Sequence, residues 1–243
     1  MAGEQQRGFG QGKITKGCLY LLAGLVGLSF FFLLSKGEMR AEIARFTAAS
    51  GESLWVEFKL WQIFTSPFLE VEFIGVLFQG FMLWMFLPSL ERWWGTKRFL
   101  KFAAITSITG VVVGTLAALL IPSVPDAYPI TGLDPLIYAS IVAYGTLFAN
   151  QPIRFFGVIP MTGRQLTIGI TCFMLVLVAV GQAWAEGAAF VSAMFAAWLL
   201  TNSNWTPKIW LLKRKQKRLR AHLKVVRDGD KPKKSPKGGK WLN

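Results

Sequence analysis

The chain has 243 residues, 53% of them hydrophobic, and a formal net charge of +14. Its one histidine, His222, lies in the basic C-terminal tail, which excludes haem ligation, an H-E-x-x-H zinc site and a Ser–His dyad within any apolar segment. Cys18 and Cys172 lie in separate apolar segments and form no metal-binding pattern. We therefore expect neither a metal nor a cofactor.

The first apolar segment, residues 17–35, is long enough to cross a hydrocarbon core of about 30 Å, which takes roughly 20 helical residues. Lys13 and Lys16 precede it, as in a secretory signal, but its apolar run is too long for one and no A-x-A cleavage motif follows. The segment is predicted to be a retained helix after a short cytoplasmic segment, residues 1–16.

Residues 36–72 are too polar to cross a membrane but rich in aromatic side chains. These are Trp55, Phe58, Trp61, Phe64 and Phe68. Because such rings favour the membrane–water interface, we expect an interfacial outer loop in which Trp61 has a structural role.

The second apolar segment, residues 73–90, ends in "LPSLERWWGTKRF". Pro88 is predicted to break the helix near its end, because proline removes a backbone donor. Glu91, Arg92, Gly95 and Arg98 are predicted to form a polar turn with a structural role.

Four more apolar segments cover residues 99–121, 135–149, 165–181 and 187–201. With six spans, all of the 27 lysines and arginines except Lys36, Arg40, Arg45 and Lys59 lie on the side of the two termini. Basic residues collect on the cytoplasmic side of membrane proteins, so both termini are predicted to be cytoplasmic. The fold class is therefore an all-α integral membrane protein, with a six-helix bundle over residues 17–205.

The tail, residues 206–243, holds about half of the basic residues and is predicted to be largely disordered at its end. From Lys208 to Lys240 it is expected to lie against anionic membrane lipids. No nucleic-acid partner is expected, because aromatic side chains do not interleave with the charges from Lys213 onward.

The stretch "GLDPLIYAS" combines Asp134 and Pro135 at the start of a predicted helix. Aspartate is a favoured N-cap and proline a favoured first helical residue, so Asp134 is expected to cap the helix. The helix would extend about 22 Å, less than the hydrocarbon core, and a carboxylate below the surface needs water or a partner. Two alternatives are that Asp134 binds a ligand or partner, and that it pairs with Glu186 as in an aspartyl protease.

Several segments resemble the rhomboid family of intramembrane proteases. They are "LWQIFTSPFLE", "GVLFQGFMLWMFLPSLERWWGTKRFL", "ITGLDPLIYASIVAYGTLFANQ" and "FFGVIPMTGRQL", within residues 1–205. The resemblance implies a six-helix membrane fold, with a structural role for Gly132. It also leads us to expect a multi-pass protein of a bacterial inner membrane.

The departures from the family pattern fall on the residues that the resemblance makes catalytic. Asp134 stands where the family has its serine, and Phe190 where it has its histidine. Gly75 and Gln79 stand at the oxyanion pair, of which Gln79 can still donate a hydrogen bond. The resemblance therefore implies a pseudoprotease with no catalytic residue.

Two classes of function remain open. The first is a non-catalytic protein that holds transmembrane segments of client proteins, with Gln79, Asp134 and Tyr138 as binding candidates and Phe190 packed against Tyr138. The alternative is an intramembrane serine-type endopeptidase that uses Ser140 or Ser192, although no base is predicted beside either serine. Small residues on the fourth and sixth helices are expected to let these helices pack closely. They are Ala139, Ala143, Ala189, Ala193 and Ala197.

Overall fold

The computed structural model describes residues 14–121, 129–150, 152–155 and 159–202. Residues 1–13 and the whole basic tail lie outside the described residues, so the lipid contacts expected of the tail stay a prediction.

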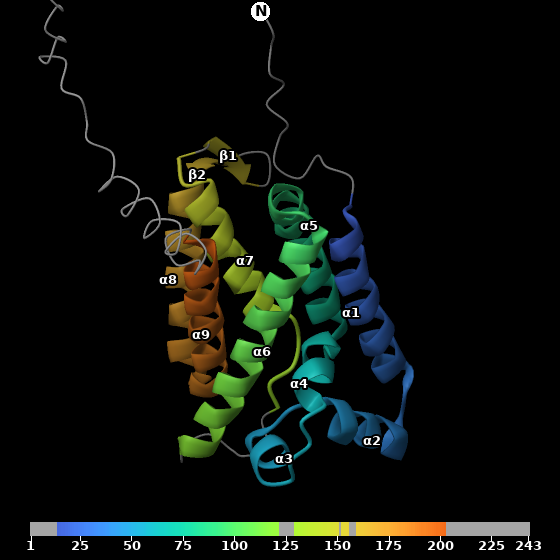
Figure 1. Ribbon diagram of the computed structural model, residues 1–243. Helices are drawn as coiled ribbons and strands as arrows, with labels where there is room; N and C mark the ends of the chain where they lie inside the picture. Colours follow the sequence, from blue (N-terminus) through green and yellow to red (C-terminus); the bar gives the residue numbers. More distant parts are fainter. Residues whose placement is uncertain (1–13, 122–128, 151, 156–158, 203–243) are drawn as a thin grey trace, which may run out of the picture. The chain divides into compact units, whose positions relative to one another are not determined.

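The helices of the described residues are shown in Figure 1. In chain order they are α1 (Lys16–Leu34), α2 (Gly37–Thr47), α3 (Gly51–Trp55), α4 (Gln62–Thr65), the 3-10 turn η1 (Ser66–Phe68), α5 (Phe73–Trp94), α6 (Thr96–Leu120), α7 (Asp134–Leu147), α8 (Gly163–Gly181) and α9 (Trp184–Thr201). Between α7 and α8, the strands β1 (Pro152–Phe155) and β2 (Ile159–Thr162) form an antiparallel hairpin in which Pro152 pairs with Thr162.

Five helices of the described part, α1, α5, α6, α8 and α9, are long and apolar enough to cross a membrane. The prediction of a multi-pass, helical integral membrane protein is therefore confirmed. The count of six spans is not, because α7 has only 14 residues, which extend about 21 Å.

α7 lies among the other long helices and packs against α5, α6, α8 and α9. Ala139, Ala189 and Ala193 are fully buried at these contacts. A Cβ atom on Gly114 of α6 would lie 2.7 Å from the Cβ atom of Ala189, so the α6–α9 contact leaves no room for a larger residue. The close packing predicted for the fourth and sixth helices is present where α7 contacts α9, and the contact of α6 with α9 was not predicted.

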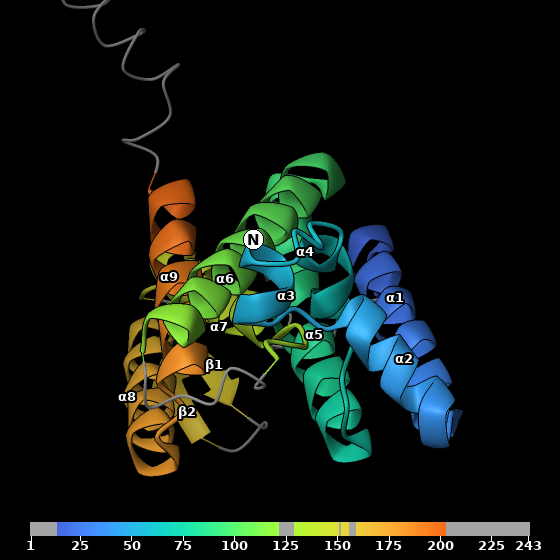
Figure 2. The ribbon, with the colours of Figure 1, turned by 90° about the horizontal axis from the view of Figure 1, so that it is seen from below.

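The segment predicted as an outer loop is folded into α2, α3, α4 and η1. Figures 1 and 2 both show α2 beside α1 and α3 beside α6. The Trp61 indole donates to the carbonyl of Phe46 at 2.9 Å, and the fully buried Gln62 amide donates to the carbonyl of Arg45 at 2.8 Å. Trp61 therefore has a structural contact, while the position of the segment at a membrane interface stays a prediction.

The same segment is fastened to the residues before α7. The Ser66 hydroxyl donates to the carbonyl of Ile130, and the Gly132 amide donates to the carbonyl of Ser66 at 3.1 Å. Ala49 also pairs with Ile130 in an isolated β-bridge. These bonds hold the start of α7 close to the start of α5.

The turn after α5 follows the prediction in part. Pro88 does not break the helix, which continues to Trp94 because Leu87, Leu90 and Glu91 are buried against neighbouring helices. Gly95 alone separates α5 from α6 and has a φ of +78°, a conformation that glycine adopts without strain. The Arg98 guanidinium lies over the Trp94 ring, 5.6 Å from its centroid.

Glu91 is buried at this end of the molecule and is fully hydrogen-bonded. Its carboxylate accepts from the backbone amides of Gly17 and Cys18 at 2.9 Å, from the Thr96 hydroxyl at 2.7 Å and from the Thr15 hydroxyl. Because the free amides of a helix start favour an anion, Glu91 holds the beginning of α1 against the end of α5.

Candidate functional site

A cluster of polar side chains lies where α5 and α7 begin, at the opposite end of α5 from Glu91. Its centre is Gln79, whose side chain is 1% exposed. The Gln79 Nε2 atom donates to Glu70 Oε2 at 2.5 Å and to Asp134 Oδ2 at 3.1 Å. Its Oε1 atom accepts from the backbone amide of Leu133 at 3.0 Å. One amide group thus joins two carboxylates and the chain before α7.

Glu70 is held rigidly in the link between η1 and α5. Its Oε1 atom accepts from the backbone amides of Val71 at 3.0 Å and Glu72 at 3.2 Å, and its own amide donates to the Ser29 hydroxyl at 2.9 Å. Burial raises the pKa of the Glu70 carboxyl above its ordinary value, although the two amide donors lower it; the nearby charges of Glu72 and Glu186 add to the rise. Glu70 is therefore easier to protonate than an exposed glutamate.

Two glycines make room for the cluster. Gly132 has a φ of +82°, and a Cβ atom there would lie 2.5 Å from Gln79 Nε2. A Cβ atom on Gly75 would lie 2.6 Å from Glu70 Cδ. Both distances are far shorter than any normal contact, so the position of the Gln79 amide depends on Gly132 and that of the Glu70 carboxylate on Gly75.

The prediction that Asp134 caps its helix is wrong. The helix begins at Asp134 itself, after Leu133 with φ −87° and ψ 12°, and no side chain caps it. Leu133 occupies the N-cap position because its backbone amide donates to Gln79 Oε1. The Asp134 carboxylate then accepts from Gln79 Nε2 and does not cap the helix. A carboxylate in the first turn is still favoured by the partial positive charge at the helix start.

The other predicted site residues lie deeper along α7 and α9. Tyr138 and Phe190 pack with their ring centroids 4.8 Å apart, the contact that was expected of them. The Ser140 hydroxyl donates to the carbonyl of Leu136 at 2.7 Å, and the Ser192 hydroxyl to that of Ala189 at 2.9 Å. Both hydroxyls therefore bond within their own helices. No set of three metal-binding side chains comes together in the part of the chain that the structure describes.

Sequence reasoning brought Gln79, Gly132 and Asp134 together as candidates but missed Glu70. The available signal was modest: an acidic residue directly before an apolar span, in "FLEVEF". Only the fold of the outer segment, which places η1 beside the start of α7, brings Glu70 to Gln79.

Comparison with known protein families identifies the chain differently from the sequence motifs. The model of a family described as "Eukaryotic integral membrane protein (DUF1751)" matches residues 18–202, and none of the curated proteins compared with the chain matches it. The identification as a rhomboid is therefore wrong, as is the expected bacterial inner membrane. The rhomboid resemblance was the only basis for equating four residues with catalytic positions, and that basis is lost for Asp134, Phe190, Gly75 and Gln79.

The residues that carried the rhomboid resemblance have structural roles in this chain. Glu91 binds the start of α1, Gly95 forms the turn between α5 and α6, and Gly132 leaves space for a buried amide. Since the family match covers most of the chain, the protein belongs to the eukaryotic integral membrane protein family DUF1751.

Proposed function

We propose that the protein acts without catalysis, by holding transmembrane segments of partner proteins, and that Glu70, Gln79 and Asp134 bind a polar or basic side chain of such a segment. The observation that carries this proposal is that two carboxylates share a single amide. In the part of the chain that the structure describes, the one ion pair joins Lys59 to Glu57, so no described cation neutralises either carboxylate. Ionisable groups within a membrane domain generally pair with a charge or serve a binding site.

The cluster can be reached from one side. Glu70, Gly75 and Asp134 are each partly exposed. Beside them, α5 presents an apolar face on which Ile74 is 76% and Leu77 58% exposed. A partner helix that packs on this face would bring a side chain of its first turns next to the two carboxylates.

The alternative function, a serine-type endopeptidase, lacks support from the contacts of its two candidate serines. A serine needs a base to become a nucleophile, and the hydroxyls of Ser140 and Ser192 donate instead to helix carbonyls. A fluorophosphonate probe should therefore leave the protein unlabelled. Labelling that disappears in Ser140→Ala or Ser192→Ala would contradict the non-catalytic proposal.

The binding proposal can be tested with two synthetic transmembrane helices of equal length, one with a lysine near its end and one with leucine there. We expect the full chain to retain the lysine helix more strongly than the leucine helix. The double variant Glu70→Gln/Asp134→Asn should lose this preference, whereas Glu38→Gln, an exposed acid on α2, should keep it. Equal retention of both helices by the unaltered protein would contradict the proposal.

We also propose that α7 is a sixth membrane span. Its central packing and its alternation in direction with α6 and α8 support this, as does its almost wholly apolar sequence after Asp134. Six crossings return the chain to the side on which it began. Reporter tags at residues 3 and 243 should therefore be found on the same side of the membrane, and tags on opposite sides would rule out six spans.

A further inference from the structure

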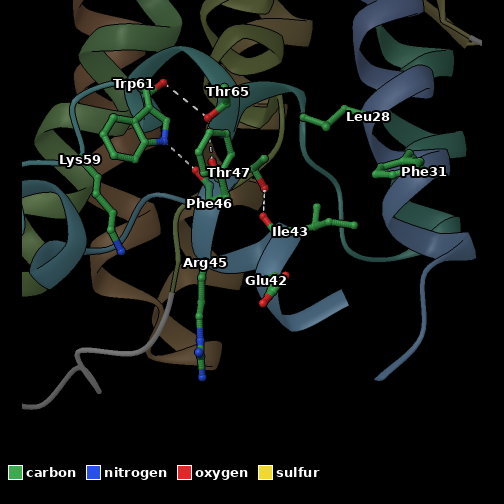
Figure 3. A pocket seen from close by; sticks show the side chains of 10 residues that line it. All are labelled: Leu28, Phe31, Glu42, Ile43, Arg45, Phe46, Thr47, Lys59, Trp61 and Thr65. Atoms are coloured by element: carbon green, nitrogen blue, oxygen red, sulfur yellow. Dashed lines mark hydrogen bonds between the residues drawn. The ribbon is translucent and has the colours of Figure 1, made fainter. Parts of the chain in front are cut away.

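A groove lies between the end of α1 and the helices α2 and α4, and none of its lining residues belongs to the polar cluster. It has a volume of about 780 Å³, within the roughly 300–1,000 Å³ usual for ligand sites. Leu28 and Phe31 of α1 and Ile43 of α2 line one side, as Figure 3 shows. Phe46 and Trp61 form another wall, with their ring centroids 5.6 Å apart.

The uncharged polar side chains in the groove wall have already used their donors. The Trp61 indole donates to the carbonyl of Phe46, the Thr47 hydroxyl to that of Ile43 and the Thr65 hydroxyl to that of Thr47. A sugar or another polar metabolite would find few free donors on this wall. The wall instead suits a hydrocarbon chain, which asks for no hydrogen bonds.

Charged groups stand at the edge of the groove. In Figure 3 the charged ends of Arg45 and Lys59 extend to the same side, away from Leu28 and Phe31. Lys59 is paired with Glu57 at 2.5 Å, whereas Arg45 forms no ion pair with any residue that the structure describes, although Glu42 also lines the groove. A guanidinium presents a planar set of donors that matches a phosphate group.

We propose that this groove binds one membrane phospholipid with an anionic headgroup, its acyl chain against Leu28, Phe31 and Ile43 and its phosphate at Arg45. The position supports this occupant: the groove opens at the end of the membrane helix α1, where the chain turns into the amphipathic α2. Phe31 and Phe46, at 53% and 60% exposed, continue the apolar wall outward. An apolar wall with a cation at its edge matches a phospholipid, whose acyl chain lies in the membrane and whose headgroup lies at the surface.

The test uses the full chain in phosphatidylcholine nanodiscs that contain a trace of phosphatidylserine with a photoactivatable diazirine in its acyl chain. Label is mapped by peptide, and the ratio of label on α1 and α2 to label on α8 is measured, because the outward apolar face of α8 reports general lipid contact. We expect the ratio to fall about fivefold in Arg45→Gln, as for loss of one basic residue near a lipid surface. Lys36→Gln, the control at an exposed basic residue directly before α2 and outside the groove lining, should leave the ratio unchanged.

Two further arms identify the occupant. Unlabelled phosphatidylserine should compete for the groove, and Ile43→Trp, which fills the apolar part but keeps both cations, should abolish the preferred labelling. Equal preferred labelling by a phosphatidylcholine that carries the same diazirine would overturn the selection for an anionic headgroup. Competition by inorganic phosphate would show a site for the free ion, and unchanged labelling in both groove variants would show general lipid contact; either result would overturn the proposal.

Discussion

The two ends of α5 hold carboxylates in different surroundings: Glu91 is buried, whereas Glu70 and Asp134 are partly exposed. Glu91, near the end of the helix, accepts hydrogen bonds from four donors, three at the start of α1 and one at the start of α6. Glu70 and Asp134, near its beginning, share the one side-chain amide of Gln79. Glu70 also accepts from the backbone amides of Val71 and Glu72, and neither carboxylate forms an ion pair with a residue that the structure describes. A buried carboxylate with four donors holds the fold together, whereas two partly exposed carboxylates that share a side-chain donor keep the capacity to bind something else.

The largest effect on stability is expected at the end of α5 that holds Glu91. Glu91→Ala would leave the amides of Gly17 and Cys18 buried without an acceptor, and should lower the free energy of unfolding by about 3 kcal/mol or more. Unfolding in a detergent–denaturant titration would measure this. The control, Glu38→Ala on the surface of α2, should change it little; a cost below about 1 kcal/mol for Glu91→Ala would remove the contrast between the two ends.

At the other end, the space for the cluster can be probed with a matched pair of glycines. Gly132→Ala should cost about 1–3 kcal/mol for its positive φ, and more because its Cβ atom meets Gln79. Gly37→Ala imposes a positive φ of +57° with no atom within 4 Å, so it isolates the backbone cost. Equal losses of unfolding free energy in the two variants would mean that Gln79 does not need its observed position.

A smaller effect concerns the pH dependence of stability. Because burial raises the pKa of Glu70 in the folded protein, the folded state binds its proton more tightly than the unfolded chain. The free energy of unfolding should therefore increase as the pH falls through this raised pKa towards the ordinary value of about 4.3. Glu70→Gln should remove this contribution, and the exposed Glu52→Gln should retain it. An unchanged pH profile in Glu70→Gln would show that Glu70 is not buried as described.

The same titration sharpens the binding proposal. Protonation of Glu70 removes the negative charge that would attract a lysine of the partner helix. The preference for the lysine helix should therefore weaken over the same fall in pH that stabilises the fold. A preference that grows stronger at lower pH would place the lysine elsewhere.

The smallest effect is expected deeper in the bundle. Phe190→Leu keeps most of the apolar volume but loses the ring contact with Tyr138, and should cost about 0.5–1.5 kcal/mol of unfolding free energy. Tyr138→Phe keeps the contact and should be nearly neutral. A larger loss in Tyr138→Phe than in Phe190→Leu would show that the hydroxyl, not the ring pair, matters at this position.

The parts of the fold that were predicted correctly from the sequence depend on residues close together in the chain. Long apolar runs predicted α1, α5, α6, α8 and α9, and Gly95 predicted the turn after α5. The start of α7 was less predictable, because Gln79, distant in the chain, takes the Leu133 amide and displaces Asp134 from the capping position. Pro88 misled for a related reason: burial of its neighbours outweighs the loss of one backbone donor.

The hydroxyl groups of the long helices have a consequence for how the chain enters the membrane. Ser140, Thr106 and Thr115 each bond to a carbonyl four residues earlier in their own helix, so these helices meet the lipid with these polar groups already satisfied. Glu91 and Gln79 depend on other segments. The donors of Glu91 on α1 are synthesised before it, whereas Gln79 must wait for Leu133 and Asp134. Until α7 emerges during synthesis, Gln79 therefore lacks two of the three partners that it has in the folded protein.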